Sequence, residues 1–400
     1  MKPSLRFPEF KDEWQEKRLG DVCAVNPRNP LVMPDKFYYI DLESVIDGRL
    51  TQCKKMKKSD APSRAQRLLK KEDVLFQTVR PYQKNNLFFN KNGNFVASTG
   101  YAQLRANDSP SFLYQLLHTN NFIEKILVRC TGSNYPAINS EDISTVSVII
   151  PPRKEQEKIA DFLRGGDERM VLLEKKVGAM REYKKGVMSA IFSGKLRFKD
   201  ENGNPYPDWE ERRLGDVILR FSTGLNPRTN FTLGNGDNYY ITIKNIKEGS
   251  LDFSNAEKIT DEAKTKINLR SSLSNGDVIM SSIGNVGEAY LLQNNPENWD
   301  INESVFALKP NLNLIDSRFL YFLITRPEFR TNMANRSTGS SFKSIKLNEL
   351  KIMTIKLPSL PEQQKIADFL SAIDHKIELE QTRLDRTKDF KKGLLQRMFV

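Results

Sequence analysis

Few residues in this chain have the types and spacing that catalysis requires. The 400 residues include two histidines, His118 and His375, and three cysteines, Cys23, Cys53 and Cys130. This scarcity argues against histidine-based catalysis and against a histidine-rich metal site. No two cysteines have metal-ligand spacing, and an odd number argues against a disulfide framework. We interpret the cysteines as buried or unreactive thiols and the histidines as ordinary surface or helix residues.

Short motifs that resemble catalytic signatures are all incomplete. Gly194-Lys195 lacks the upstream glycine and the following Ser or Thr of a phosphate-binding loop. The segment NPYP at 204–207 has a different order from the Asn-Pro-Pro-Tyr of DNA adenine methyltransferases. Asp208 with the distant Glu262 and Lys264 matches a nuclease motif only in part, because the separation is long. The sequence therefore shows no complete signature for catalysis or for a cofactor, and no constellation of residues for a metal.

The basic residues of the chain indicate a binding function more clearly than these motifs indicate catalysis, because they could contact a polyanion. The chain has 62 Lys and Arg against 50 Asp and Glu, a net charge of +12. A run of charges is by default a solvated surface, but this excess also suits a nucleic-acid partner. Lysines and arginines crowd residues 54–71, and from this cluster we predict DNA phosphate contacts at Lys54, Lys55, Lys57, Lys58, Arg64 and Arg67.

Two further loops follow matching segments but differ in content. The apolar segment from Asp73 leads into QTVRPYQKNN, whereas its match from Asp277 leads into SSIGNVGEAY. After a shared Thr-Gly-Ser, the text reads NYPAI from residue 134 and SFKSI from residue 341. Polar and aromatic groups on loops can contact base edges or phosphates, although the second pair could equally be turn residues that enter a helix. The predicted DNA contacts here are Arg80, Tyr82, Lys84, Asn134 and Tyr135 in the first copy, and Ser281, Ser282, Asn285, Ser341, Phe342 and Lys343 in the second.

An internal repeat must position these loops. EQEKIADFL at 155–163 returns as EQQKIADFL at 362–370, and WQEKRLGDV from Trp14 returns as WEERRLGDV from Trp209. The repeat also closes on itself, because Leu-Arg-Phe follows the first long segment at 196–198 and opens the chain at 5–7. The pattern predicts two pseudo-symmetric halves with adjacent termini. The second copy is 12 residues longer before Phe319, and we place the extra residues in loops.

Each nonapeptide begins a long amphipathic stretch. Prolines at 151–152 and 358–361 precede acidic residues, which indicates helix starts. Apolar residues then recur every three or four positions, as in a coiled-coil seam, although Gly165-Gly166, Glu380 and Lys391 interrupt the pattern. A helix of about 38 residues is roughly 57 Å long and cannot bury its apolar stripe alone. We therefore predict that the two helices pair antiparallel as a coiled coil.

Three polar positions of the nonapeptide recur without an obvious structural reason. Helix capping and core packing explain the initial Glu and the apolar residues. They do not explain the recurrence of polar residues that we expect to be exposed. The alternative is a docking face for a partner that binds twice. The predicted docking residues are Gln156, Lys158, Asp161, Gln363, Lys365 and Asp368.

The predicted fold class is α+β, with two pseudo-symmetric globular domains joined by the two long antiparallel helices of the coiled coil. The segments are a first domain at 1–150, a spacer helix at 151–193, a linker at 194–208, a second domain at 209–357 and a second helix at 358–400. We expect strands at 95–105, 239–246 and 304–309, a shorter helix after Pro110 through residue 127, and its equivalent at 317–333. No apolar run can span a bilayer, and the first residues, MKPSLRFPEF, lack the continuous apolar region of a signal peptide, so we expect a cytoplasmic protein.

With the repeated W-x-E-x-R-L-G-D-V, Thr-Gly-Ser and EQ-x-KIADFL motifs, the whole chain resembles the specificity subunit of a type I restriction-modification enzyme. The resemblance implies that each variable region reads one half of a split, asymmetric sequence in double-stranded DNA. It implies that the coiled coil spaces the readers and docks two methyltransferase subunits, which use S-adenosylmethionine. It further implies two restriction subunits, which use ATP and Mg, beside a specificity subunit that is not catalytic.

Two other classes of function remain as alternatives. One is a non-enzymatic coiled-coil scaffold that joins two proteins, with its basic charge incidental. The other is a nuclease that acts alone, which would require a carboxylate cluster that the sequence does not show.

Overall fold

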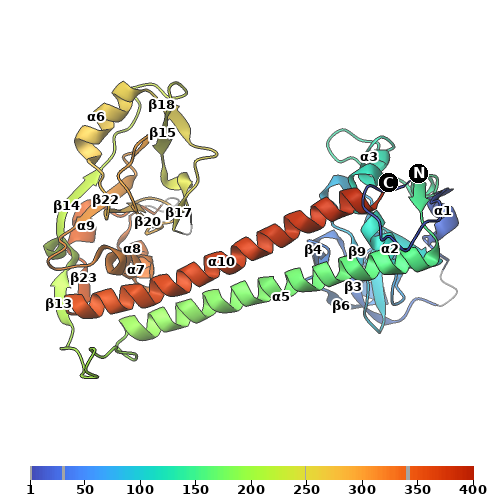
Figure 1. The fold of residues 1–400 in the computed structure, drawn as a ribbon, viewed down its shortest axis with the longest axis horizontal. Coiled ribbons are helices and arrows are strands. Elements are labelled where there is room, and N and C mark those ends of the chain that lie inside the picture. The colour runs from blue at the N-terminus through green and yellow to red at the C-terminus, as the bar shows by residue number, and fades with distance from the viewer. Residues whose placement is uncertain (1, 29–31, 248, 339–342) are drawn as a thin grey trace. The chain divides into compact units, whose positions relative to one another are not determined.

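The computed structural model describes residues 2–28, 32–247, 249–338 and 343–400 (Figure 1). Its contacts divide the chain into two units. Unit 1 comprises Met1–Lys175 with Gln381–Val400, and unit 2 comprises Lys176–Glu380. Each unit therefore contains about half of each long helix together with one globular part.

Unit 1 combines two four-stranded sheets with a framework of short elements. A framework strand pair, β1 (Gln15–Arg18) with β12 (Ser147–Ile150), lies beside the short helices α1 (Leu19–Val22) and α4 (Ser140–Ser144). One sheet has the order β6 (Lys54–Lys57), β3 (Lys36–Ile40), β10 (Phe95–Ser98) and β7 (Ala65–Leu68). The other has the order β2 (Cys23–Val25), β11 (Tyr101–Ala106), β8 (Val74–Gln77) and β9 (Leu87–Phe88). A small hairpin pairs β4 (Val45–Ile46) with β5 (Arg49–Leu50).

The core of unit 1 joins the second sheet to helices. Helices α2 (Pro110–Leu116) and α3 (Asn120–Leu127) pack their apolar faces against β8, the start of one long helix and the end of the other. We predicted a single helix after Pro110, and this prediction is wrong. The Thr119 hydroxyl accepts a hydrogen bond from the Phe122 backbone N–H and so caps a new helix where the first has ended.

Unit 2 repeats this order of elements. Its framework pair is β13 (Glu210–Arg213) with β23 (Thr354–Leu357), beside the 3₁₀ turn η4 (Leu214–Val217) and α9 (Leu347–Lys351). One sheet has the order β14 (Ile218–Thr223), β22 (Val305–Pro310), β19 (Val278–Ser281) and β20 (Ala289–Leu291), and the other has β18 (Glu257–Ile259), β15 (Asn238–Ile241) and β21 (Trp299–Ile301). The hairpin β16 (Ile246–Lys247) with β17 (Ser250–Leu251) and the helices α7 (Ser317–Thr325) and α8 (Pro327–Arg336) complete the match. Helix α6 (Asp261–Ser271) stands between β18 and β19, where unit 1 has β7.

The repeated Leu-Gly-Asp-Val has a packing explanation. Leu19 and Leu214 are fully buried, and Asp21 and Asp216 each accept a hydrogen bond from the arginine backbone N–H three residues earlier. A Cβ at Gly215 would lie 3.0 Å from the Lys351 carbonyl oxygen, so glycine lets the turn approach α9 closely. Both copies thus need the same residues for the same contact.

The two long helices run uninterrupted, α5 from Arg153 to Phe192 and α10 from Leu360 to Met398. They pair antiparallel within each unit (Figure 1). In unit 1 the Lys391 ammonium lies 2.5 Å from the Asp167 carboxylate, and in unit 2 the Lys176 ammonium lies 2.8 Å from Glu380. The polar residues that interrupted the apolar stripe are therefore partners in interhelical ion pairs. Among the described residues, no helix is apolar over a length that would cross a membrane.

The Leu-Arg-Phe segments form hydrogen bonds to the first turns of α5 and α10. Arg6 forms two hydrogen bonds to the fully buried Glu155 carboxylate, at 2.7 and 2.8 Å, and Arg197 does the same to Glu362, at 2.7 and 3.0 Å. Each carboxylate raises the pKa of its arginine through these hydrogen bonds. The Leu5 backbone N–H donates to the carbonyl oxygen of Arg397, which confirms that the termini are adjacent.

Candidate nucleic-acid interface

Two loops meet at one end of the sheets in unit 1. We call residues 79–85 and 131–137 the paired loops of unit 1. The Arg80 N–H donates to the Pro136 carbonyl at 2.7 Å, and Ile138 N–H donates to the Thr78 carbonyl at 3.1 Å. Thr131 and Ala137 close the second loop by exchanging two backbone hydrogen bonds. The two loops are therefore joined to each other by backbone hydrogen bonds, which do not depend on the side chains at these positions.

The corresponding loops of unit 2 are joined in the same way. These paired loops of unit 2 comprise the described residues 283–288, 338 and 343–345. Gly284 N–H donates to the Lys343 carbonyl at 2.8 Å, and Ile345 N–H donates to the Ser282 carbonyl at 2.9 Å. Thr338 and Ser344 exchange two hydrogen bonds, as Thr131 and Ala137 do. The predicted contacts Ser341 and Phe342 lie outside the described residues.

Aromatic and cationic side chains gather on the paired loops of unit 1. The Arg80 guanidinium lies 4.2 Å from the centre of the Tyr135 ring. Tyr135 is 63% exposed and Tyr82 is 49% exposed, and Asn134 is exposed as well. A tyrosine offers both a flat ring and a hydroxyl to a partner, and here two of them lie exposed, one of them against a guanidinium. The predicted residues Arg80, Tyr82, Asn134 and Tyr135 are thus brought together.

The structure places three predicted contacts differently. Lys84 is half-buried, and its ammonium donates to the His118 carbonyl at 2.9 Å and to Asn120 Oδ1 at 2.8 Å. The expectation that Ser281 and Ser282 offer their hydroxyls to DNA is wrong, because both residues are buried. Their hydroxyls donate to the carbonyl oxygens of residues 285 and 304. These three side chains hold the loops in place rather than extend from them.

Asn285 and Lys343 are exposed on the paired loops of unit 2. Asn285 Oδ1 accepts a hydrogen bond from Arg330 at 2.7 Å, and the same guanidinium lies 3.2 Å from Glu288. Arg330 was not predicted, because it lies on helix α8, where a charged residue reads as ordinary solvated surface. Only the tertiary structure brings it to the loop.

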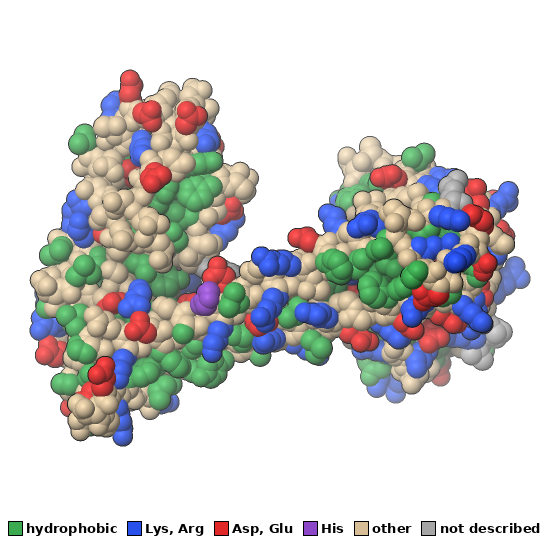
Figure 2. All heavy atoms as spheres, viewed as in Figure 1, with side chains coloured by type: hydrophobic (Ala, Val, Ile, Leu, Met, Phe, Trp, Pro, Cys, Tyr) green, Lys and Arg blue, Asp and Glu red, His purple; other side chains and the backbone are tan. Residues whose placement is uncertain are grey.

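The basic cluster of unit 1 follows an edge strand. β6 is the outer strand of its sheet, and Lys54, Lys55 and Lys57 on it are exposed. Lysines at sheet edges also prevent strand addition by another chain, so the stripe has a structural explanation beside phosphate contact. Figure 2 shows Lys and Arg side chains across the visible surface of this unit, interspersed with acidic ones.

The remaining basic residues differ in their surroundings. Lys58 and Arg64 are exposed. The Arg64 carbonyl accepts a hydrogen bond from the Thr99 N–H, and the next residue, Gly100, accepts one from the Thr78 N–H. Arg64 therefore lies near the start of the paired loops. Arg67 is only partly exposed, and burial lowers its pKa. Lys55 lies over the Tyr38 ring at 5.8 Å, and Lys258 of unit 2 lies over Tyr239 at 3.4 Å in the matching register. The sequence analysis missed Lys258, because only the strand register aligns it with Lys55.

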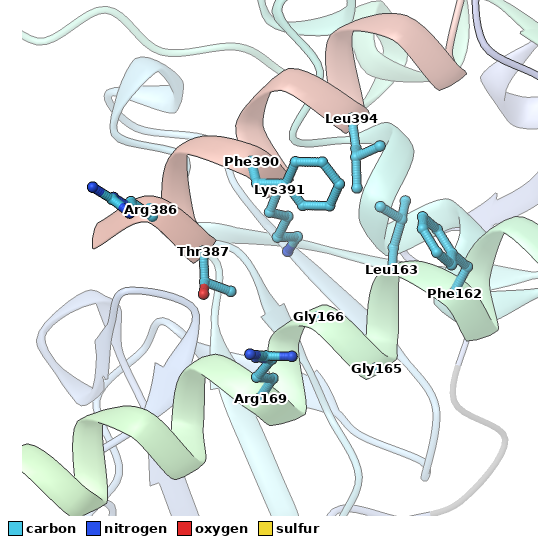
Figure 3. A pocket seen from close by; sticks show the side chains of 10 residues that line it. All are labelled: Phe162, Leu163, Gly165, Gly166, Arg169, Arg386, Thr387, Phe390, Lys391 and Leu394. Atoms are coloured by element: carbon cyan, nitrogen blue, oxygen red, sulfur yellow. The ribbon is translucent and has the colours of Figure 1, made fainter. Parts of the chain in front are cut away.

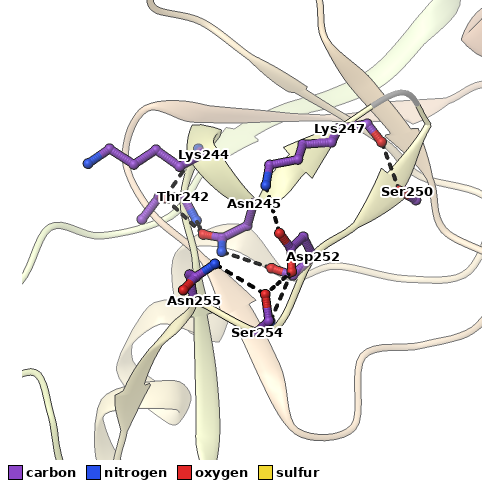
Figure 4. Close-up of polar contacts among 8 residues, drawn as sticks. All are labelled: Thr242, Lys244, Asn245, Lys247, Ser250, Asp252, Ser254 and Asn255. Carbon is purple, nitrogen blue, oxygen red and sulfur yellow. Dashed lines mark hydrogen bonds and ion pairs between the residues drawn. The ribbon is translucent and has the colours of Figure 1, made fainter. Parts of the chain in front are cut away.

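A polar hairpin adds rigidity in unit 2. Thr242 caps the 3₁₀ turn η5 (Ile243–Asn245), and Asn245 Nδ2 donates to the Asp252 carbonyl at 2.9 Å (Figure 4). Lys247 and Ser254 donate to the Asp252 carboxylate, and these bonds lower its pKa to about 2. In unit 1 the matching hairpin is tied to the paired loops, because Asn85 Nδ2 donates to the Val45 carbonyl.

The predicted docking residues divide into two groups. The expectation that Gln156 and Gln363 are exposed is wrong. Both are buried, with their amide N–H groups donating to the carbonyls of Pro151 and Pro358, and Gln363 also accepts from the Asp316 N–H. Lys158, Asp161 and Asp368 are exposed, and Lys365 is half-exposed, with its ammonium on the Lys199 carbonyl. Two of the predicted docking residues are therefore exposed in unit 1, and two lie at least partly exposed in unit 2.

A cleft of about 460 Å³ opens between the helices within unit 1 (Figure 3). Gly165 and Gly166 line it from α5, and a Cβ on either would meet no atom within 4 Å. The other residues that line it are Phe162, Leu163, Arg169, Arg386, Thr387, Phe390, Lys391 and Leu394. Exposed aromatic rings beside an open apolar hollow are typical of a protein-binding surface. At the position of Gly166 the second copy of the repeat has Ile373, which is buried in unit 2.

Comparisons with known proteins agree with this arrangement. The family model for the type I restriction modification DNA specificity domain matches twice, at residues 11–178 and 206–388. This chain belongs to that family. Each match covers one set of paired loops and most of one long helix.

Curated relatives and solved structures extend the likeness over the whole length. The MjaVIII specificity subunit of Methanocaldococcus jannaschii is 23% identical over 98% of this chain and 92% of its own. The EcoBI specificity subunit of Escherichia coli is 23% identical over 64% of this chain and 56% of its own. The type I S subunit of M. genitalium has the same fold, with a TM-score of 0.59, 16% identity and coverage of 100% and 99%. A second solved structure comes from a study of "complex assembly" of "the type I R-M system". It matches this chain with a TM-score of 0.61 and 20% sequence identity, over 98% of both chains.

Within the described ranges, no three His, Cys, Asp or Glu side chains lie close enough together to hold a metal ion. Burial raises the pKa of the Cys23 thiol to about 12. Burial lowers the pKa of His118 to about 4, so this imidazole is neutral at pH 7. The Cys23 side chain lies in the core of unit 1, and the His118 ring lies against the Tyr114 ring.

Proposed function

We propose that this chain is the DNA sequence-recognition subunit of a type I restriction-modification complex, with each unit reading one part of a bipartite, asymmetric DNA site. The observation that carries the proposal is the pair of joined loops, which recurs in both units on the same backbone hydrogen bonds with different side chains. A constant backbone with variable side chains suits two readers of unlike sequences. Membership of the type I restriction modification DNA specificity family supports the proposed function.

The residues divide the work of recognition. Lys54, Lys55, Lys57, Lys58 and Arg64 supply positive charge for phosphate contacts, which position the protein but carry no sequence information. The side chains of the paired loops contact base edges in the grooves, where the pattern of donors and acceptors identifies the base pair. Arg80, Tyr82, Asn134 and Tyr135 serve one half-site, and Asn285, Arg330 and Lys343 serve the other.

The long helices dock the partner subunits. Two methyltransferase subunits, which use S-adenosylmethionine, bind beside the repeated Lys158, Asp161, Lys365 and Asp368, and two restriction subunits complete the complex. The specificity subunit itself is not catalytic. An apolar side chain from one partner fits the cleft at Gly165 and Gly166, where Arg169 and Arg386 favour acidic neighbours.

Co-purification with the cellular partners, followed by mapping of methylated adenines, tests the function. The proposal expects methylation at one split sequence. A protein scaffold without DNA recognition would give a complex that does not retain DNA, and a nuclease acting alone would give metal-dependent cutting by the purified chain. Either of those results would contradict the proposal.

A further inference from the structure

One arginine of the paired loops occupies a backbone position that suits glycine. Arg80 has φ 55° and ψ 55°, the left-handed conformation that residues with a Cβ rarely adopt. Its counterpart in unit 2, in the loop that follows the matching strand, is Gly284, with φ 72°. The two positions also make the same backbone hydrogen bond to the partner loop, at 2.7 and 2.8 Å. In unit 2 a glycine adopts this conformation and makes this hydrogen bond without a side chain. The presence of an arginine at the same position in unit 1 therefore points to a use of its side chain.

That side chain is arranged for an external contact. Its guanidinium stacks on the exposed Tyr135 ring at 4.2 Å, and no described carboxylate pairs with it. Its Nε atom is buried with no hydrogen-bond partner among the described residues. A guanidinium that stacks on an aromatic face keeps its hydrogen-bonding edge free and fixed in direction. Internal contacts therefore orient the Arg80 guanidinium without engaging its terminal N–H groups.

We propose that Arg80 reads a guanine in the major groove of the half-site bound by unit 1, with its terminal N–H groups donating to O6 and N7. Arginine is the side chain that most often recognises guanine in this way. Tyr135 is a positioning residue that holds the guanidinium plane. Unit 2 has no side chain at Gly284, so its half-site lacks this contact. The inference rests on the proposed function, because it names one base contact of that same interface.

The test compares complexes assembled with wild-type chain and with Arg80→Gly, Arg80→Lys and Lys84→Gly chains. Methylation of a randomised DNA library gives the base preference at every position of both half-sites. Arg80→Gly should lose about 5- to 150-fold discrimination for guanine at one position of one half-site. It should leave the melting temperature within about 4 °C, because glycine suits this backbone conformation. Arg80→Lys should retain charge but lose most of the discrimination, since lysine lacks the planar fork.

Lys84→Gly is the matched control on the same turn. Lys84 is also left-handed, with φ 54°, and the substitution also removes one positive charge. Its ammonium holds the turn to His118 and Asn120, so the variant should lower the stability of unit 1, and the loss of preference should spread over the half-site rather than fall on one guanine position. Tyr135→Phe, which keeps the stacking ring, should preserve the guanine preference that Tyr135→Leu loses.

Three outcomes would overturn the inference. Uniform weakening over all sequences by Arg80→Gly would mean a phosphate contact, an unchanged preference would mean no contact, and a change in both half-sites would mean an indirect effect. A wild-type complex without any sequence preference would instead contradict the proposed function itself, so the two failures are distinguishable.

Discussion

The buried carboxylates Glu155 and Glu362 show how much of the repeated nonapeptide serves the fold. Each is fully buried and bound by two hydrogen bonds from an arginine of a Leu-Arg-Phe segment far away in sequence. The adjacent glutamines bond to backbone carbonyls. The first two residues of the motif are therefore retained for folding, which narrows the residues available for docking to Lys158, Asp161, Lys365 and Asp368.

Removal of one such arginine should destabilise its unit strongly. Arg197→Ala leaves the Glu362 carboxylate buried, with the Trp209 indole N–H as its remaining side-chain partner among the described residues. We expect a loss of about 3–5 kcal/mol in the free energy of unfolding, measured by urea denaturation with tryptophan fluorescence. The control is Arg212→Ala, whose exposed pair with Glu210 should be worth less than about 1 kcal/mol. Equal losses in the two variants would show that the buried pair has no special role.

A buried acid in unit 2 predicts a pH dependence. Burial raises the pKa of Asp300 to about 6, above its ordinary 3.8. The folded state therefore holds a proton that the unfolded state has released, and the resulting stability is full below pH 4 and lost as the pH rises to about 6. Asp300→Asn should be more stable than the wild type at pH 7, by roughly 2–3 kcal/mol, and the difference should vanish near pH 4. A difference that stays constant with pH would contradict this assignment.

At this scale the sequence predicted residue types better than their exposure. Arg80 and Tyr135 were identified from their loops, and the structure brings them into contact. Gln156, Ser281 and Ser282 were expected on the surface, but they are buried. Their hydrogen-bond partners are backbone carbonyls, which any residue carries, so no sequence pattern marks them.

At the scale of elements, the long helices were the most predictable feature, because their apolar periodicity extends over many turns. The structure places them at Arg153–Phe192 and Leu360–Met398, close to the predicted starts and ends. The single helix expected after Pro110 was wrong, since the capping role of Thr119 depends on one hydroxyl in an otherwise helical composition. Helix α6 was not predicted either, because its polar sequence shows little amphipathic pattern.

The cleft on these helices gives a prediction for assembly. Gly166→Ile introduces the residue that the second copy has at Ile373 and fills the hollow without a loss of helix propensity. We expect the affinity for the methyltransferase subunit to fall about tenfold, measured by sedimentation of the mixed subunits. Gly178→Ile is the control, because Gly178 lies on the same helix, also with open space at its Cβ, and outside the cleft. If both variants bind alike, the cleft is not a docking site.

At the scale of the whole molecule, the proposed function rests on the basic surface, which would contact DNA, and on the internal repeat, which provides two units. Edge protection and phosphate contact are two explanations of the β6 lysines, and salt dependence separates them. Substitution of Lys54, Lys55 and Lys57 by alanine should reduce the slope of log affinity for DNA against log salt by roughly 3 if all three contact phosphates. An unchanged slope, with increased self-association of the variant, would favour edge protection alone.

The repeat also predicted the adjacent termini and the two halves with matching elements, since framework residues such as Leu19 and Leu214 recur where the same packing recurs. It could not predict what each half recognises. Base reading depends on side-chain directions that the paired loops set through contacts between distant segments, as with Arg330 beside Asn285.

The most direct test of the account is an exchange of one reader. Residues 20–150 are replaced by the corresponding region of another member of the family, the complex is assembled with its methyltransferase subunits, and methylated sites are mapped. The account predicts that one half-site changes while the other half-site stays as it was. A change in both halves, or in neither, would contradict the claim that each unit reads its own part of the DNA.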